Sequence, residues 1–179
     1  MTEGEDLIRV ERATVEDAVG IRLVIRAAMA KYVRDSGIPG QVDALGEDVL
    51  DLMRYITEDA VFVARVGRNI VGTVRLSLEA AAHAYLSRFA VLPGNQSKGV
   101  GSMLFEAAEQ YLQTQGVRSV RLHTALTNTP LVRFYENPVF RLAARSDERG
   151  YPRGLLIKEF DPPGGLPPES VTPLLPECQ

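Results

Sequence analysis

Short runs of alternating or β-branched residues along the chain predict the strands of a sheet. The expected strands are "LIRVERA" (7–13), "AVFVARV" (60–66), "NIVGTVRLSL" (69–78), "AYLSRFAVL" (84–92), "VRSVRLHTAL" (117–126), "FRLAAR" (140–145) and "GLLIKEF" (154–160). A short "GRN" segment joins the second and third runs, and its glycine indicates a hairpin turn.

Apolar residues at helical spacing predict four helices between these strands. The first follows a capping box formed by Thr14 and Asp17 and continues to about Lys31, where "RDSGIPG" breaks the pattern. The others are expected from about Glu47 to Thr57, over 102–116 with Gly116 as the stop, and over 129–136 with Thr129 as N-cap and Pro130 at the first position.

The order of these elements indicates the fold class. A strand and two helices precede three strands, a strand–loop–helix unit, one more strand, a short helix and two final strands. Hairpins outnumber crossover connections, so we expect an α/β sandwich built on a mixed, mainly antiparallel sheet of about seven strands with helices on both faces.

The length of 179 residues suits one domain, which we place at 1–160. The remaining segment, 161–179, holds six of the eleven prolines and can form neither a regular helix nor an interior strand. It is expected to be an extended tail or a segment that packs along its own domain or a partner subunit.

Composition narrows the class of protein. A net charge of −3 provides no basic field for nucleic acid, and Cys178, the single cysteine, cannot form a disulfide within the chain. The acidic start of the chain does not resemble a signal peptide, and charges interrupt every long apolar stretch. We therefore expect a cytoplasmic protein that binds neither nucleic acid nor membrane, and we predict no metal site.

The segment "VLPGNQSKGVGSML" (91–104) lies between a predicted strand and a predicted helix. Free backbone N–H groups and the positive end of a helix dipole make such a loop an anion site. It is not a Walker A loop, because Val100 follows Gly99 where lysine is required, and it is not the dinucleotide fingerprint, because Leu104 replaces the third glycine.

Two motifs resemble those of the GNAT superfamily of acyl-CoA-dependent N-acetyltransferases. "Q-S-K-G-V-G" (96–101) fits the pattern Q/R-x-x-G-x-G/A, and "N-T-P-L-V-R-F-Y-E-N" (128–137) follows about thirty residues later. The resemblance extends over 7–160 in element order and is specific from Phe89 to Tyr135. One departure is "YENPVF", where many relatives have a glycine before the aromatic residue, so the turn after Tyr135 must differ.

The resemblance implies a site for acetyl-CoA as cosubstrate. It implies that the fourth and fifth strands splay apart and that the pantetheine arm lies in the gap as an added strand, along Phe89, Ala90 and Val91. The pyrophosphate would be held by Gln96, Ser97, Lys98, Gly99, Val100, Gly101 and Ser102. Asn128 would hydrogen-bond the arm, and Tyr135 would face the sulfur.

The implied reaction is attack of an amine on the thioester with loss of a thiolate, and it places three demands on the site. The amine must be neutral, the oxyanion must be stabilised, and the leaving sulfur must receive a proton. The Val91 N–H is the expected oxyanion donor and Tyr135 the expected general acid. No usual base stands in the middle of the central strands, so the general base is unassigned, with a preference for a water relay held by Ser87. Glu79 and His83 are expected at the surface near the far hairpin, and His123 is expected to be a packed or edge histidine.

Two functions therefore fit the sequence. One is an N-acetyltransferase acting on a small-molecule amine or a peptide N-terminus. The other is an acyl-CoA-binding regulatory module with the same fold but little turnover, which the missing base keeps open. A nicotinamide-dependent dehydrogenase is excluded by the loop pattern and the hairpin-rich order.

The acceptor would be chosen by the first two helices and the segment between them. The acidic residues of that segment either attract a cationic amine or form a solvated loop; they are Asp35, Asp43, Glu47 and Asp48. Pairing into homodimers is a further expectation from the resemblance.

Overall fold

Seven strands form one sheet in the order β1-β2-β3-β4-β5-β7-β6 in the computed structural model, which describes residues 7–40, 42–136 and 139–161. The strands are β1 (Ile8–Arg12), β2 (Ala60–Val66), β3 (Asn69–Glu79), β4 (His83–Val91), β5 (Ser119–Ala125), β6 (Arg141–Ser146) and β7 (Arg153–Glu159). Every neighbouring pair is antiparallel except β4–β5, which is parallel. The predicted mixed, mainly antiparallel sheet is confirmed.

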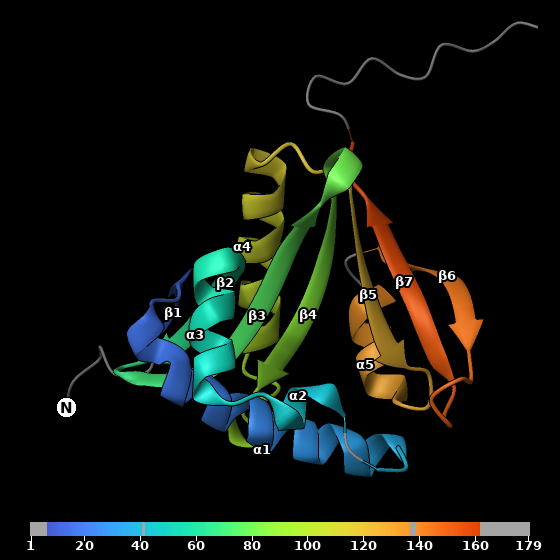
Figure 1. Ribbon diagram of the computed structural model, residues 1–179, viewed down its shortest axis with the longest axis horizontal. Coiled ribbons are helices and arrows are strands. Elements are labelled where there is room, and N and C mark those ends of the chain that lie inside the picture. Colours follow the sequence, from blue (N-terminus) through green and yellow to red (C-terminus); the bar gives the residue numbers. More distant parts are fainter. Residues whose placement is uncertain (1–6, 41, 137–138, 162–179) are drawn as a thin grey trace, which may run out of the picture.

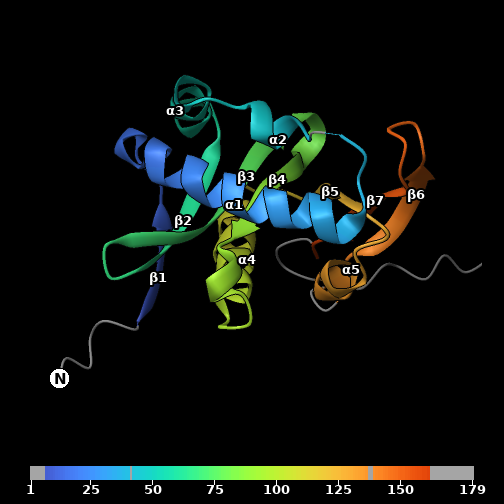
Figure 2. The ribbon, with the colours of Figure 1, turned by 90° about the horizontal axis from the view of Figure 1, so that it is seen from below.

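Five helices accompany the sheet in the described residues: α1 (Ala18–Ser36), α2 (Asp43–Gly46), α3 (Val49–Glu58), α4 (Val100–Thr114) and α5 (Thr129–Glu136). Short 3-10 turns are formed by η1 (Val15–Asp17), η2 (Ala80–Ala82) and η3 (Pro93–Asn95). In Figure 2, which looks from below, α2 and α3 lie on one side of the sheet and α4 and α5 on the other, and α1 crosses in front of the strands. Helix α1 shares a core with α3, so it covers the same face. This arrangement confirms helices on both faces.

The strand predictions agree with the structure to within about two residues, and the helix predictions need three corrections. Helix α1 continues past Lys31 to Ser36 and ends at Gly37, whose φ of 63° supplies the left-handed turn. Helix α2 was not predicted, because four residues carry no periodic signal. The N-cap of α5 is Asn128 and not Thr129, because Asn128 Oδ1 accepts a hydrogen bond from the N–H of Leu131 at 3.3 Å.

Two hydrophobic cores lie on opposite faces of the sheet. On one face, α1 and α3 cover apolar side chains of β2 such as Val61 and Val63. On the other face, α4 packs on a larger core that includes Leu76, Leu104 and Leu122. Each strand therefore sends alternate residues into different cores, and this fixes which side chains face which helices.

The parallel pair β4–β5 is joined only at one end. Its register covers His83↔Ser119, Ala84↔Val120 and Tyr85↔Arg121, and the strands separate beyond it. Figure 1 shows the two strands meeting at η2 and diverging toward α1. The splayed fourth and fifth strands implied by the sequence resemblance are confirmed.

Within the described residues, no helix is both long enough and apolar enough to cross a membrane. Of the predicted tail, only Asp161 belongs to the described residues, and the division at residue 160 stays a prediction.

Candidate active site

The loop between β4 and α4 lines a cavity at the open end of the β4–β5 pair. Ser97 and Gly99 both have left-handed backbone conformations, with φ of 70° and 82°. The first hydrogen bond of α4 runs from the Met103 N–H to the Gly99 carbonyl at 3.1 Å, so the N–H groups before it have no partner inside the helix. The first turn of α4 contains no acidic side chain that would compete for these groups.

Glycine is required at two positions of this loop for different reasons. A Cβ on Gly99 would meet no atom within 4 Å, so that residue borders open space, and its φ disfavours any other residue. A Cβ on Gly101 would lie 3.1 Å from Phe89 Cζ, so Gly101 lets α4 approach the aromatic side chain of β4. The loop therefore combines exposed backbone with close packing directly behind it.

A cavity of about 850 Å³ extends from this loop into the gap between β4 and β5. From β4 it is lined by Ser87, Phe89, Ala90 and Val91, and from the loop by Gln96, Ser97, Gly99, Gly101 and Ser102. Asn128 and Tyr135 line it from the β5–α5 side. Lys98 is exposed outside the cavity wall and Val100 is buried beneath the loop, so their side chains do not line it.

The backbone of Val91 faces the gap. The N–H of the next residue, Leu92, donates to Val71 of β3 at 2.8 Å. Because successive N–H groups of a strand point in opposite directions, the Val91 N–H points away from β3, toward β5. Its carbonyl accepts a hydrogen bond from Gln96 Nε2 at 3.3 Å, so the Gln96 amide braces the loop against β4.

Tyr135 is buried in an aromatic cluster at the cavity wall, with an exposed fraction of 4%. Its ring centroid lies 5.7 to 6.1 Å from those of Phe89, Phe105, Phe134 and Phe140. Burial raises the pKa of the Tyr135 phenol far above its ordinary value, so the hydroxyl stays protonated at every physiological pH. The altered turn after it contains Val139 with φ of 68°, whereas Asn137 and Pro138 lie outside the described residues.

Asn128 uses both ends of its amide within the protein. The oxygen caps α5, and Nδ2 donates to Ser36 Oγ of α1 at 3.2 Å. The neighbouring Thr127 hydroxyl also donates to α1, at the Ser36 carbonyl, at 2.7 Å. Asn128 thus ties the end of α1 to the start of α5 while its residue borders the cavity.

Ser87, the predicted holder of a water relay, belongs to a charged group on the α1 side of the sheet. Its Oγ accepts a hydrogen bond from Arg75 Nε at 3.1 Å. Glu47 Oε1 accepts from Arg88 Nη2 at 2.6 Å and lies 3.4 Å from Arg75 Nη1. Arg88 itself has φ of 51°, at the point where the β3–β4 register shifts, so the Glu47–Arg88 pair accompanies a β-bulge beside the cavity.

The four acidic residues between the first helices are all engaged. Asp35 pairs with Lys31, Asp43 pairs with Arg149, and Glu47 is the acceptor described above. Asp48 caps α3 by accepting from the Asp51 N–H at 2.8 Å. Asp35, Asp43 and Glu47 thus have positive partners and Asp48 has a structural role at the start of α3, which favours the interpretation without a cationic amine.

Two residues that the sequence did not assign to the site meet in the cavity. Tyr85 Oη and His123 Nδ1 are 2.8 Å apart, and both residues line the wall. Burial lowers the pKa of His123, and the nearby guanidinium groups of Arg153, Arg121 and Arg149 lower it further. The parallel register places Tyr85 beside Arg121, and His123 follows two residues later on the same face, so the pair could be found only once that register was known.

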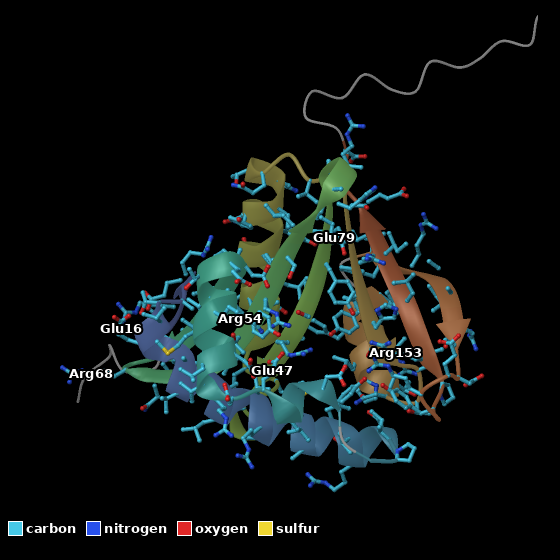
Figure 3. All side chains as sticks on the ribbon, viewed as in Figure 1. Glu16, Glu47, Arg54, Arg68, Glu79 and Arg153 are labelled. Carbon is cyan, nitrogen blue, oxygen red and sulfur yellow. The ribbon has the colours of Figure 1, made fainter. Side chains whose placement is uncertain are left out.

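Glu79 and His83 lie at the closed end of β4–β5, as expected. Glu79 forms two hydrogen bonds with Arg121, at 2.7 and 3.0 Å, and His83 Nδ1 lies 2.7 Å from Ser119 Oγ. Neither residue lines the cavity. Figure 3 shows Glu79 near the closed end of the two strands and Glu47 and Arg153 on either side of the open end.

Comparisons with known proteins agree with this geometry. The structure of PaiA N-acetyltransferase from Thermoplasma acidophilum, in complex with coenzyme A, is similar with a TM-score of 0.74 and 19% identity, over 86% of this chain and 99% of that one. The ribosomal-protein-S18-alanine N-acetyltransferase from Escherichia coli gives 0.65 and 16%, over 86% and 94%. A GNAT-family acetyltransferase from Staphylococcus aureus Mu50 gives 0.69 and 18%, over 86% and 99%.

These identities show a shared fold. No curated protein sequence matches the chain. The model of the acetyltransferase (GNAT) family matches residues 29–138, which is more than half of the 179 residues. The matched range includes Tyr135 and the backbone amides of residues 97–102, here called the amide loop. The chain belongs to the acetyltransferase (GNAT) family.

Proposed function

We propose that this chain is an N-acetyltransferase that moves the acetyl group of acetyl-CoA to a primary amine by direct attack. The observation that supports this most strongly is the continuous cavity from the amide loop at Ser97–Ser102 into the gap between β4 and β5. The site fits acetyl-CoA because an anion-binding loop, an unpaired strand edge and a buried acid follow one another along one wall.

The chain's own residues would divide the work of binding. The loop amides, at the positive end of α4, would hold the diphosphate, with Lys98 nearby as a screened positive charge. The free edge of β4 at Phe89, Ala90 and Val91 would pair with the amide-containing arm. Asn128 borders the same cavity, and its amide keeps one free N–H and one free lone pair beside its bonds to Ser36 and Leu131, so it would both position α5 and hydrogen-bond the arm.

Two groups would assist the chemical step. The Val91 N–H points into the gap and would donate to the oxyanion, a contribution of about 3 kcal/mol. Tyr135 would donate a proton to the departing sulfur. Burial keeps its phenol protonated but raises its pKa, so the proton transfer would be coupled to departure of the sulfur. Ser87 stays the candidate holder of a water relay, and its bond to Arg75 fixes the orientation of its oxygen.

Acetyl-CoA binding and turnover would test this function separately. Calorimetry with acetyl-CoA should give one site per chain, and thiol release should rise when amines are added. Binding without acetyl transfer to any member of a broad panel of small amines and peptide N-termini would favour the acyl-CoA-binding module instead. A homodimer and a cytoplasmic location stay predictions.

A further inference from the structure

The charged side chains that line the cavity cancel one another except at one position. Lys31 pairs with Asp35, and Arg149 with Asp43 at 3.0 Å. Arg88 is paired with Glu47 as described above. Within the described ranges 7–40, 42–136 and 139–161, Arg153 lines the cavity and forms no ion pair, so the open end of the cavity carries one uncompensated positive charge.

Arg153 lies on the same face of the sheet as the Tyr85–His123 pair. Across β5–β7, Ala125 is opposite Arg153 and His123 is opposite Leu155. Alternate residues of a strand share a face, so His123 and Arg153 both face the α1 side. Tyr85 joins them from β4 through its 2.8 Å contact with His123.

The electrostatic environment of this group is positive. Besides burial, three arginines lower the pKa of His123. Arg121 and Arg149 are paired with Glu79 and Asp43, so the net positive charge comes from Arg153. The same field raises the free energy of a bound ammonium group and so favours the neutral, reactive form of an amine. A second cationic group on the acceptor would be repelled, whereas a carboxylate would be attracted.

We propose that Arg153, His123 and Tyr85 form an acceptor subsite for amines that carry a carboxylate. Arg153 binds the carboxylate, because its planar guanidinium can donate two parallel hydrogen bonds to it. His123, oriented by Tyr85, accepts the proton of the amine directly, in place of a water relay at Ser87. This inference rests on the proposed acetyl transfer and names its acceptor class and its base.

The acetyl transfer needs no proton donor or acceptor beyond His123 and Tyr135. A bond forms between the amine nitrogen and the acetyl carbon, and the bond between that carbon and sulfur breaks. The proton lost by nitrogen goes to His123 and the thiolate takes a proton from Tyr135. Both residues return to their starting forms by exchange with solvent, so that an amide and a thiol leave.

Matched acceptors would test the carboxylate preference. Wild-type protein should acetylate a small amino acid with a kcat/KM at least tenfold above that for its amide, and more still above that for a diamine such as putrescine. Arg153→Met should remove most of that preference by raising KM for the amino acid, with little change for the amide. Arg145→Met is the control, because Arg145 lies on β6 outside the cavity wall.

The two histidines of the chain provide a matched pair for the proton acceptor. His123→Gln should lower kcat for an alkylamine acid by tenfold or more, and much less for an acceptor whose amine is already neutral at the assay pH. His83→Gln should leave both unchanged, because His83 lies outside the cavity wall and bonds Ser119. Tyr85→Phe should lower kcat less than His123→Gln does, and it should shift the pH dependence of kcat that His123 causes.

A binding readout separates this subsite from the proposed function. In a His83→Gln background one histidine NMR signal remains, and adding a small amino acid should shift it, but not in the Arg153→Met variant. Failure of the wild type to bind acetyl-CoA would overturn the proposed function. Acetylation of the amide or of putrescine as efficiently as the amino acid, or an Arg153→Met loss shared by all acceptors, would overturn only the subsite.

Discussion

The N–H of Ala125 donates a hydrogen bond to Tyr32 Oη at 2.7 Å, so a side chain of α1 occupies the edge of β5 where β4 has moved away. An N–H at that place would otherwise have no strand partner. Burial raises the pKa of the Tyr32 phenol, which therefore stays protonated. Helix α1 thus helps to keep the two strands apart.

Tyr32→Phe should lower the free energy of unfolding by about 1–3 kcal/mol, because it leaves a backbone donor without its partner. Chemical denaturation measures the change. The control is Tyr111→Phe, since that ring lies outside the cavity and contacts Arg12 through its face. Equal stability of the Tyr32→Phe variant and the wild type would show that the hydrogen bond is replaced by solvent.

Gly99→Glu should abolish acetyl-CoA binding, because the new side chain and its charge would enter the space beside the loop amides. The matched control is Gly116→Glu, at the other end of α4. Both glycines have positive φ, of 82° and 69°, and both border open space, so the backbone strain is similar. Calorimetry should show binding only in the control, and binding by both variants would contradict the loop assignment.

Tyr135→Phe should reduce turnover by about one to two orders of magnitude with little change in the affinity for acetyl-CoA. The change keeps the ring and its packing against Phe105 and Phe140. Steady-state kinetics and calorimetry together test it. Unchanged kcat would remove Tyr135 from the mechanism.

Glu47→Gln should destabilise the protein by about 3 kcal/mol, because it leaves the half-buried guanidinium group of Arg88 without its carboxylate and leaves Arg75 with only the more distant Asp59, at 3.8 Å. Glu159→Gln, which breaks the exposed pair with Arg141, is the control and should cost less than about 1 kcal/mol. Thermal or chemical denaturation compares them. Similar losses for both variants would mean that the Glu47 cluster does not hold the bulge of β4.

The lowered pKa of His123 predicts a pH dependence of stability. The unfolded chain binds a proton at this residue at a higher pH than the folded chain, so the free energy of unfolding falls as the pH drops through about 6.5. Asp17 and Glu79 also have lowered pKa values, but they act below their ordinary values near 4. Denaturation between pH 7 and 5 should therefore show a loss that His123→Gln removes and His83→Gln keeps.

Much of the fold could be predicted because each strand and most helices have a local signal. The periodic runs, the glycine turns and the capping box at Thr14 and Asp17 all depend on residues close in sequence. The sequence places the N-cap of α5 at Thr129 because Asn128 and Thr129 both favour that position, and the hydrogen bond from the Leu131 N–H to Asn128 Oδ1 distinguishes them.

The candidate site could be predicted only in part for the same reason. The loop between β4 and α4 is a continuous segment, so its position in the fold could be predicted from its own residues, and its role in binding stays a prediction. The Tyr85–His123 pair joins residues 38 positions apart in sequence, and it depends on the register of a parallel strand pair that no local pattern specifies. The pairing of Glu47 with Arg88 also joins residues far apart in the chain, 41 positions, so no local pattern predicts it.

The short seam between β4 and β5 has a mechanical consequence. Three residue pairs join a four-stranded half of the sheet to a three-stranded half, and beyond them each half presents an edge inside the molecule. A ligand that hydrogen-bonds to both edges would connect the two halves of the sheet. Ligand binding in the cleft should therefore reduce local opening in both halves of the sheet. Backbone amides of both halves should exchange with deuterium more slowly in the bound protein.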